Sequence, residues 1–220
     1  MSASASTEGV SGLSAPSAST ESVPAAPRDR RAERNAATRQ EILDAAWQLV
    51  REYGLAALTM RDLGSRVGMR AQSLYAYFPS KHAIYDAMFA EGNRDILARL
   101  RQLPTRSDPV RALKDQARLY LQFCVEDPVR YQLLYQRTIP GFAPSPESYT
   151  PAMEGLDLVW AALEACGVTT GRARDTWTAV ISGLAAQQNA NEPGGQRWVR
   201  LVNDAIDMFL AHHQPGKAKP

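Results

Sequence analysis

A stretch of polar, basic and aromatic residues, RAQSLYAYFPSK at positions 70–81, carries the most distinctive side-chain chemistry in this sequence. In a helix, Leu74 and Phe78 would share one face, and Gln72 and Ser73 would lie on the opposite face. Amide and guanidinium groups can read base edges in the DNA major groove, while tyrosine hydroxyls and lysines can bind phosphates. These residue types on one short face favour a surface that contacts DNA.

The residues just before this stretch predict a first short helix that begins after Thr59. A tight turn joins it to a second helix within the stretch itself. Thr59 can cap the first helix by accepting from a free backbone N–H, and Asp62 stands where a capping-box partner is expected. Gly68 suits the left-handed conformation that ends a helix. Pro79 disfavours a helical conformation at Phe78, which sets the expected end of the second helix. Two such helices form a helix-turn-helix, whose second helix reads DNA.

The pattern TMRDLGSRVG followed by LYAYFPSK closely resembles the N-terminal domain of the TetR family of bacterial transcriptional repressors. The similarity is close from Arg39 to Met88 and only architectural afterwards. It implies a homodimer that binds a palindromic operator in double-stranded DNA and is released by a small, largely apolar effector of unknown identity.

The resemblance also assigns roles to single residues by position. It implies phosphate contacts for Thr59, Tyr75 and Lys81, base contacts for Arg61, Gln72 and Ser73, and a flanking backbone contact for Tyr77. Arg70 joins this set on its charge and placement. Ala76 departs from the pattern, because many relatives carry a larger aromatic residue or histidine there, so one usual contact is expected to be missing or shifted to Tyr77.

Lysine and arginine are concentrated in the segment that contains this motif. Residues 28–81 hold ten Lys and Arg against six Asp and Glu, whereas residues 82–220 hold fifteen of each kind. Residues 1–27 contain no basic residue. The basic excess therefore coincides with the predicted DNA contact, although the formal net charge of the chain is only +2.

With 220 residues, 45% of them hydrophobic, the chain can form two modest domains. We expect an all-α fold, because no useful length of sequence alternates as a strand would. The expected order is a disordered Ser/Ala/Pro-rich tail and basic arm (1–34), a three-helix DNA-binding domain (35–85), a helical ligand-binding and dimerisation domain (86–213) and a disordered tail (214–220). The cluster of Arg28, Arg30, Arg31 and Arg34 suits either a solvated helix start or an arm that reaches the minor groove.

Apolar spacing and helix breakers predict the individual helices. The first spans 38–53, with Tyr53 facing inward, and a long fourth helix over 80–103 joins the two domains. The remaining helices are expected at 109–126, 128–135, 149–166, 171–188 and 196–211, with a loop at 138–147. The last two helices have broad apolar faces, which can pack only on earlier helices or also form a four-helix bundle with a second copy. The resemblance favours the homodimer.

Several other kinds of site are not indicated by the sequence. Cys124 and Cys166 fall in apolar helical patterns, which suits core residues in a reducing cytoplasm. His82, His212 and His213 form no metal-ligand spacing with them, and no catalytic motif or cofactor-binding motif is present, so we expect neither a metal, a cofactor nor an enzyme. No apolar run approaches the roughly 20 residues of a membrane helix, and the start does not resemble a signal peptide.

A set of large apolar residues at helical spacing supplies the candidates for a ligand cavity. They are Met88, Phe89, Tyr120, Phe123, Tyr131, Tyr135, Met153, Trp160 and Trp177. Taken alone, such a set indicates a core, whereas the resemblance implies that some of its members line a cavity. The alternatives to a repressor are a helical protein-interaction module without DNA binding, or a small-molecule-modifying enzyme with no recognisable motif.

Overall fold

Nine α-helices and two short 3-10 helices account for the regular structure of residues 30–213, the part of the chain that this computed structural model describes. The elements are α1 (Arg30–Tyr53), η1 (Leu55–Ala57), α2 (Met60–Arg66), α3 (Ala71–Leu74), α4 (Lys81–Arg101), α5 (Pro109–Glu126), α6 (Pro128–Tyr135), α7 (Pro146–Ala165), α8 (Gly171–Asn191), η2 (Val199–Leu201) and α9 (Val202–His213). No strand occurs in this range, which confirms the predicted all-α class.

Local capping signals fix the starts of most of these helices. The Ser80 side chain accepts from the Ala83 N–H at the start of α4, and Asp108 accepts from the Val110 N–H at the start of α5. Proline occupies the first turn of α5, α6 and α7, where its missing N–H has no helical partner to lose. The predicted starts of α4 and α5 are therefore confirmed.

The first helix departs from its predicted start and from its predicted inward face. It begins at Arg30 rather than at Thr38, because the run from 30 to 39 is rich in Arg and Ala, which are good helix formers. Arg30, Arg31 and Arg34 are thus part of a solvent-exposed helix start. Tyr53 is 68% exposed, since it ends α1 just before Gly54, so its predicted burial is wrong. The predicted tail and arm at 1–34 is also wrong for residues 30–34, which belong to α1. Residues 1–29 and the predicted tail at 214–220 lie outside the described residues.

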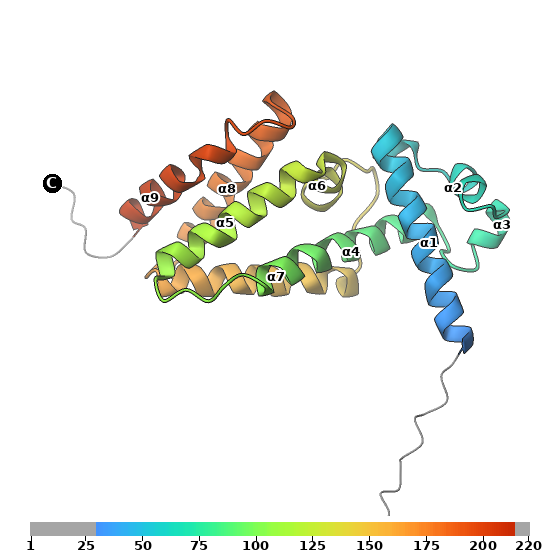
Figure 1. Ribbon diagram of the computed structural model, residues 1–220, viewed down its shortest axis with the longest axis horizontal. Helices are drawn as coiled ribbons and strands as arrows, with labels where there is room; N and C mark the ends of the chain where they lie inside the picture. Colours follow the sequence, from blue (N-terminus) through green and yellow to red (C-terminus); the bar gives the residue numbers. More distant parts are fainter. Residues whose placement is uncertain (1–29, 214–220) are drawn as a thin grey trace, which may run out of the picture.

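The helices form two ends joined by α4 (Figure 1). At one end, α1, α2, α3 and the first half of α4 share a core that includes Ile42, Leu63, Leu74 and Tyr85, each fully or almost fully buried. At the other end, α5, α8 and α9 share a core around Leu121, which is also fully buried. Helix α7 runs alongside α4 at this second end, where its Leu163 joins the same core (Figure 1). The long helix α4 therefore contributes to both ends of the molecule.

A buried arginine ties α4, α5 and α6 together where these two cores meet. The Arg130 guanidinium donates to Asp95 Oδ2 on α4 at 3.1 Å and to the Phe123 carbonyl on α5 at 2.9 Å. Its Cζ also lies 3.5 Å from the centre of the Phe123 ring. These contacts fix α6 against α4 at the junction.

Candidate nucleic-acid interface and interior cavity

Helices α2 and α3 form the predicted helix-turn-helix. Thr59 caps α2 by accepting from the Asp62 N–H at 3.1 Å, and Gly68 takes the predicted left-handed conformation, with φ of 68°. The turn folds back on α2, because the Met69 N–H donates to the Gly64 carbonyl at 2.8 Å. A Cβ at Gly64 would lie only 2.7 Å from the Met69 carbonyl oxygen. Glycine therefore permits the close approach of the turn to α2.

The second helix is shorter than the sequence predicted. It is α-helical only from Ala71 to Leu74, and residues 75–77 continue it as a turn. The Tyr77 N–H and the Phe78 N–H both donate to the Leu74 carbonyl, at 2.9 Å each. The predicted helical end at Phe78 is thus corrected to Leu74, with a turn over residues 75–77. Pro79 restricts the backbone of Phe78 alone, so it does not by itself account for the earlier end.

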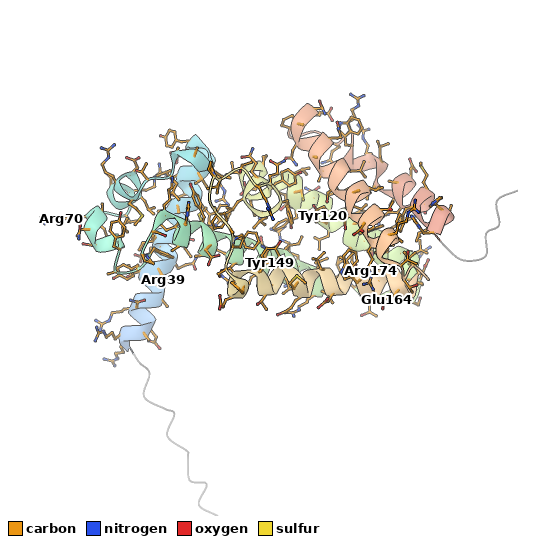
Figure 2. All side chains as sticks on the ribbon, turned by 180° about the vertical axis from the view of Figure 1, so that it is seen from behind. Arg39, Arg70, Tyr120, Tyr149, Glu164 and Arg174 are labelled. Carbon is orange, nitrogen blue, oxygen red and sulfur yellow. The ribbon has the colours of Figure 1, made fainter. Side chains whose placement is uncertain are left out.

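The polar face of α3 points into solvent. Arg70, Gln72 and Ser73 are exposed, and Tyr75 is 50% exposed, whereas Leu74 is fully buried beneath them. Figure 2 shows Arg70 at the extreme end of the molecule. No acidic residue lies on α3, and Arg61 on α2 is also exposed beside Asp62, 3.7 Å away. This end of the molecule thus presents hydrogen-bond donors and positive charge to solvent.

The other predicted contact residues are partly engaged within the chain. Besides capping α2, the Thr59 hydroxyl donates to Asp62 Oδ2 at 2.6 Å. Tyr77 and Lys81 are half-buried, and the Lys81 ammonium lies 5.9 Å from the ring centre of Tyr85. These three residues border the exposed face of α3 instead of lying at its centre, which suits contacts to the DNA backbone.

Arg39 is a further residue of this region that sequence reasoning did not single out. Its guanidinium donates to the Tyr77 carbonyl and stacks on the Phe78 ring, with its Cζ 4.2 Å from the ring centre. It thereby fastens the end of the α3 turn to α1. Thirty-eight residues separate the two partners, so no local pattern could have indicated the contact.

A cavity of about 430 Å³ lies between α4, α5, α6, α7 and α8. Its wall is formed by Phe89, Asn93, Ile96, Leu100, Gln116, Ala117, Tyr120, Tyr131, Leu134, Tyr135, Tyr149, Pro151, Ala152, Gly155, Leu156, Val159, Trp177, Thr178, Ile181 and Ser182. None of these side chains is charged. Figure 2 shows Tyr120 and Tyr149 in the middle of the molecule, well away from Arg70.

Five of the nine candidate pocket residues line this cavity, namely Phe89, Tyr120, Tyr131, Tyr135 and Trp177. The other four lie elsewhere. Met88 is in the core shared by α1, α2, α3 and the first half of α4, and Phe123 lies beneath Arg130. Met153 is 50% exposed, and Trp160 packs beside Arg174. Helical spacing identifies an inward face, but it cannot show which inward residues leave space between them.

The Tyr120 and Tyr135 hydroxyls are neutral at pH 7, as ordinary tyrosines are, and their surroundings favour the neutral form further. Burial raises the pKa of Tyr120 and of Tyr135 well above the usual tyrosine range. Burial likewise raises the pKa of the Cys124 thiol, which lies behind Tyr120, to about 12. Neither cysteine forms a disulfide. The cavity and its immediate support therefore present uncharged groups at neutral pH.

Helices α8 and α9 leave a shallow apolar groove on the outer surface. Trp177, Ile181, Ile206 and Phe209 are buried within the chain, as a face packed on earlier helices would be. The groove itself is lined by Thr176, Val180, Leu184, Leu201, Asp204, Ala205, Met208, Phe209, His212 and His213. Met208 is 74% exposed. Only part of the apolar surface of these two helices is thus covered by the chain itself.

One carboxylate links α4 to the start of α7. Asp86 accepts from the Ser145 N–H at 2.7 Å, from the Ser145 hydroxyl at 2.9 Å and from the Ser148 hydroxyl at 2.8 Å. Ser145 also caps α7. We refer to Asp86, Ser145 and Ser148 as the α4–α7 clasp. Asp86 directly follows Tyr85, which belongs to the core shared by α1, α2, α3 and the first half of α4.

Residues 30–213 offer neither a membrane span nor a metal centre. Each helix in this range is too short or too polar to serve as a transmembrane segment. Within the same range, no three His, Cys, Asp or Glu side chains are grouped so as to hold a metal ion.

Comparison with known proteins connects the helix-turn-helix to a family. Residues 42–88 match the profile of bacterial regulatory proteins of the tetR family. The tetracycline repressor protein class D of Escherichia coli is 38% identical over 61 residues, which are 28% of this chain and 26% of that repressor. The matched stretch therefore spans about a quarter of that relative.

Solved structures resemble the chain over most of its length. PfmR of Thermus thermophilus, a TetR family transcriptional regulator, has a TM-score of 0.58 and 20% identity, covering 77% of this chain and 96% of its own. The transcriptional regulator FadR of Bacillus subtilis, solved with stearoyl-CoA, has a TM-score of 0.58 and 15% identity, covering 82% of this chain and 99% of its own. At these identities the likeness shows a shared fold.

Proposed function

We propose, on the premise that residues 42–88 belong to the tetR family of bacterial regulatory proteins, that this chain is a ligand-responsive transcriptional repressor. The observation that carries the proposal is the exposed, acid-free face of α3 on a helix-turn-helix. In this proposal Gln72, Ser73, Arg61 and Arg70 reach base edges. Thr59, Tyr75, Tyr77 and Lys81 bind the flanking phosphates.

The repressor acts as a homodimer in this proposal. The groove on α8 and α9 packs against the same groove of a second copy, which would cover Leu201 and Met208, 41% and 74% exposed in the single chain. A two-fold axis then presents two α3 helices to one face of the DNA. Their separation must be about 34–36 Å, or a larger multiple of the helical repeat, to enter successive major grooves.

The effector binds in the cavity and acts on DNA affinity through α4. Helix α7 supplies Tyr149, Pro151 and Gly155 to the cavity wall, and the α4–α7 clasp joins its first turn to α4. A ligand that moves α7 would thus move the start of α4, on which the DNA-binding end packs. The operator binds one arrangement of α4, and the ligand binds the moved arrangement more tightly. Operator affinity then falls according to the ratio of the ligand's affinities for these two arrangements, so ligand and operator antagonise each other.

Substitutions of Gln72 and Lys81 separate base reading from phosphate binding. Gln72→Ala is expected to weaken binding by roughly 1–3 kcal/mol at the contacted base pair and to relax the preference there, if the amide makes a bidentate contact. Lys81→Ala is expected to weaken binding to all duplexes and to reduce the slope of log affinity against log salt by about 1. Fluorescence anisotropy with matched and mismatched duplexes at several salt concentrations measures both effects.

Gln122→Ala serves as the matched control for this pair, because Gln122 is an exposed glutamine of α5, away from the DNA-binding end. It should leave affinity, preference and salt slope unchanged. A Lys81→Ala protein whose sequence preference alone changed would show that Lys81 does not bind phosphate. A Gln72→Ala protein with unaltered preference would remove Gln72 from the reading face.

A further inference from the structure

The uncharged wall of the cavity disfavours a charged ligand. None of the twenty lining residues carries a charged side chain, and burial raises the pKa of Tyr120 and of Tyr135 still further above neutral pH. An ion placed there would lose its hydration without gaining an opposite charge, which is strongly unfavourable. Arg130 does not belong to the wall, and its two terminal nitrogens donate to Asp95 and to the Phe123 carbonyl. The cavity is therefore suited to a neutral molecule.

The wall also favours a flat aromatic shape. Aromatic rings face the space from several sides, with Phe89 and Tyr149 paired at 5.4 Å between ring centres and Tyr120 and Tyr135 paired edge to face at 5.3 Å. Trp177 adds a further ring from α8. Rings in such arrangements offer faces and edges on which another ring system can stack. A volume of about 430 Å³ suits a small molecule of a few fused or linked rings.

One polar atom in the wall lacks a partner. Gln116 Oε1 on α5 is buried and accepts no hydrogen bond. A buried acceptor without a partner is rare in folded proteins, because its lost hydration is not replaced. Gln116 belongs to the cavity wall, so a small rotation of its amide would present this acceptor to a bound molecule. A ligand with a hydroxyl or N–H group would supply the missing donor.

We infer that the cavity binds a neutral, planar aromatic molecule whose hydroxyl or N–H group donates a hydrogen bond to Gln116. The inference rests on the proposed function in taking this molecule to be the effector, and it narrows the effector to one chemical class. It excludes ligands that must bury a charge, such as an aromatic carboxylate. It also distinguishes this cavity from a site that binds an acyl-CoA, because the phosphates of an acyl-CoA need cationic side chains as partners.

Isothermal titration calorimetry of the full chain at pH 7 tests the inference with three probes of one ring system. 2-Naphthol is expected to bind roughly three- to tenfold more tightly than 2-methylnaphthalene, which has the same shape but no donor. 2-Naphthoate is expected to bind at least roughly 100-fold more weakly than 2-naphthol. Ala152→Phe, which fills the cavity from α7, should abolish binding of both neutral probes and so locate them.

Gln116→Leu is the decisive variant, because leucine keeps much of the volume and removes the acceptor. In this variant 2-naphthol and 2-methylnaphthalene should bind about equally tightly, because the preference for 2-naphthol is lost while 2-methylnaphthalene keeps its affinity. Retained binding of 2-methylnaphthalene also shows that the variant is folded. Gln122→Leu, at an exposed position of the same helix, should keep the full preference. Equal binding of 2-naphthoate, an unchanged preference in Gln116→Leu, or no binding of either neutral probe would overturn the inference.

A second arm separates this inference from the proposed function. 2-Naphthol and stearoyl-CoA are each added to the complex of the chain with its operator duplex. Cavity binding of 2-naphthol with unchanged operator affinity would contradict the ligand response and leave the ligand class standing. Release of the operator by stearoyl-CoA, with no binding of either naphthalene, would support a ligand-responsive repressor and overturn the ligand class.

Discussion

Gly64→Val is expected to weaken specific operator binding by roughly 100-fold or more, toward the level of non-specific binding. A Cβ alone at this position would lie 2.7 Å from the Met69 carbonyl oxygen and 3.2 Å from the Ala71 N. Both neighbours are backbone atoms of the turn, so they can give way only if α3 moves relative to α2. The two methyl groups of valine add to this displacement. Gln72 and Ser73 are then carried away from the base edges.

The same substitution should leave the rest of the molecule intact, since Gly64 meets only the turn and the start of α3. Overpacking of this kind costs about 1–3 kcal/mol of stability. Circular dichroism and sedimentation would report the retained helix content and oligomeric state. Gly171→Val is the matched control, because a Cβ at that first residue of α8 meets nothing within 4 Å. Unchanged specific affinity in Gly64→Val would mean that the α2–α3 spacing does not position the reading face.

Met208→Lys is expected to dissociate the proposed dimer. Met208 lies in the α8–α9 groove and is 74% exposed in the single chain, so pairing of two grooves would bury it. Removing a lysine charge from water costs several kcal/mol even with a carboxylate such as Asp204 of the same groove nearby. We take about 2–5 kcal/mol for each copy, and a two-fold interface contains the substitution twice. The dimer dissociation constant should therefore rise by roughly 1,000-fold or more. Analytical ultracentrifugation across a range of protein concentrations measures it directly.

Ala161→Lys introduces the same charge at an exposed position of α7 outside the groove, and it should leave the dimer unchanged. Operator affinity should fall in Met208→Lys and remain unchanged in Ala161→Lys, because a monomer presents only one α3 helix. A Met208→Lys protein that still sedimented as a dimer would place the interface elsewhere on the molecule.

Sequence signals that act over a few residues predicted much of the fold. Ser80 and Asp108 cap α4 and α5 as expected, and Gly68 takes its left-handed conformation. These features succeed because a cap or a breaker needs only its immediate backbone. The failure at Tyr53 has a different origin. Helical spacing gave this residue an inward direction, but whether another element covers that face is decided by the tertiary arrangement.

The parts of the candidate sites that escaped prediction depend on contacts between distant residues. Arg39 reaches the carbonyl of Tyr77 across 38 positions, and Asp86 reaches Ser145 across 59. Gln116 is one of several glutamines, and only the packing of the surrounding helices leaves its oxygen buried without a partner. The cavity itself is a gap between five helices. Periodicity identifies the residues that face inward, but the volume left between them depends on how those helices pack.

The central claim is that two copies of the α3 face read one DNA duplex together. Selection of bound sequences from a pool of random duplexes, using the purified full chain, tests it most directly. We expect enrichment of an inverted repeat whose half-site centres are separated by about one helical turn, roughly 10–10.5 base pairs, or a multiple of it. Enrichment of a single site without two-fold symmetry, or of no sequence at all, would contradict the claim.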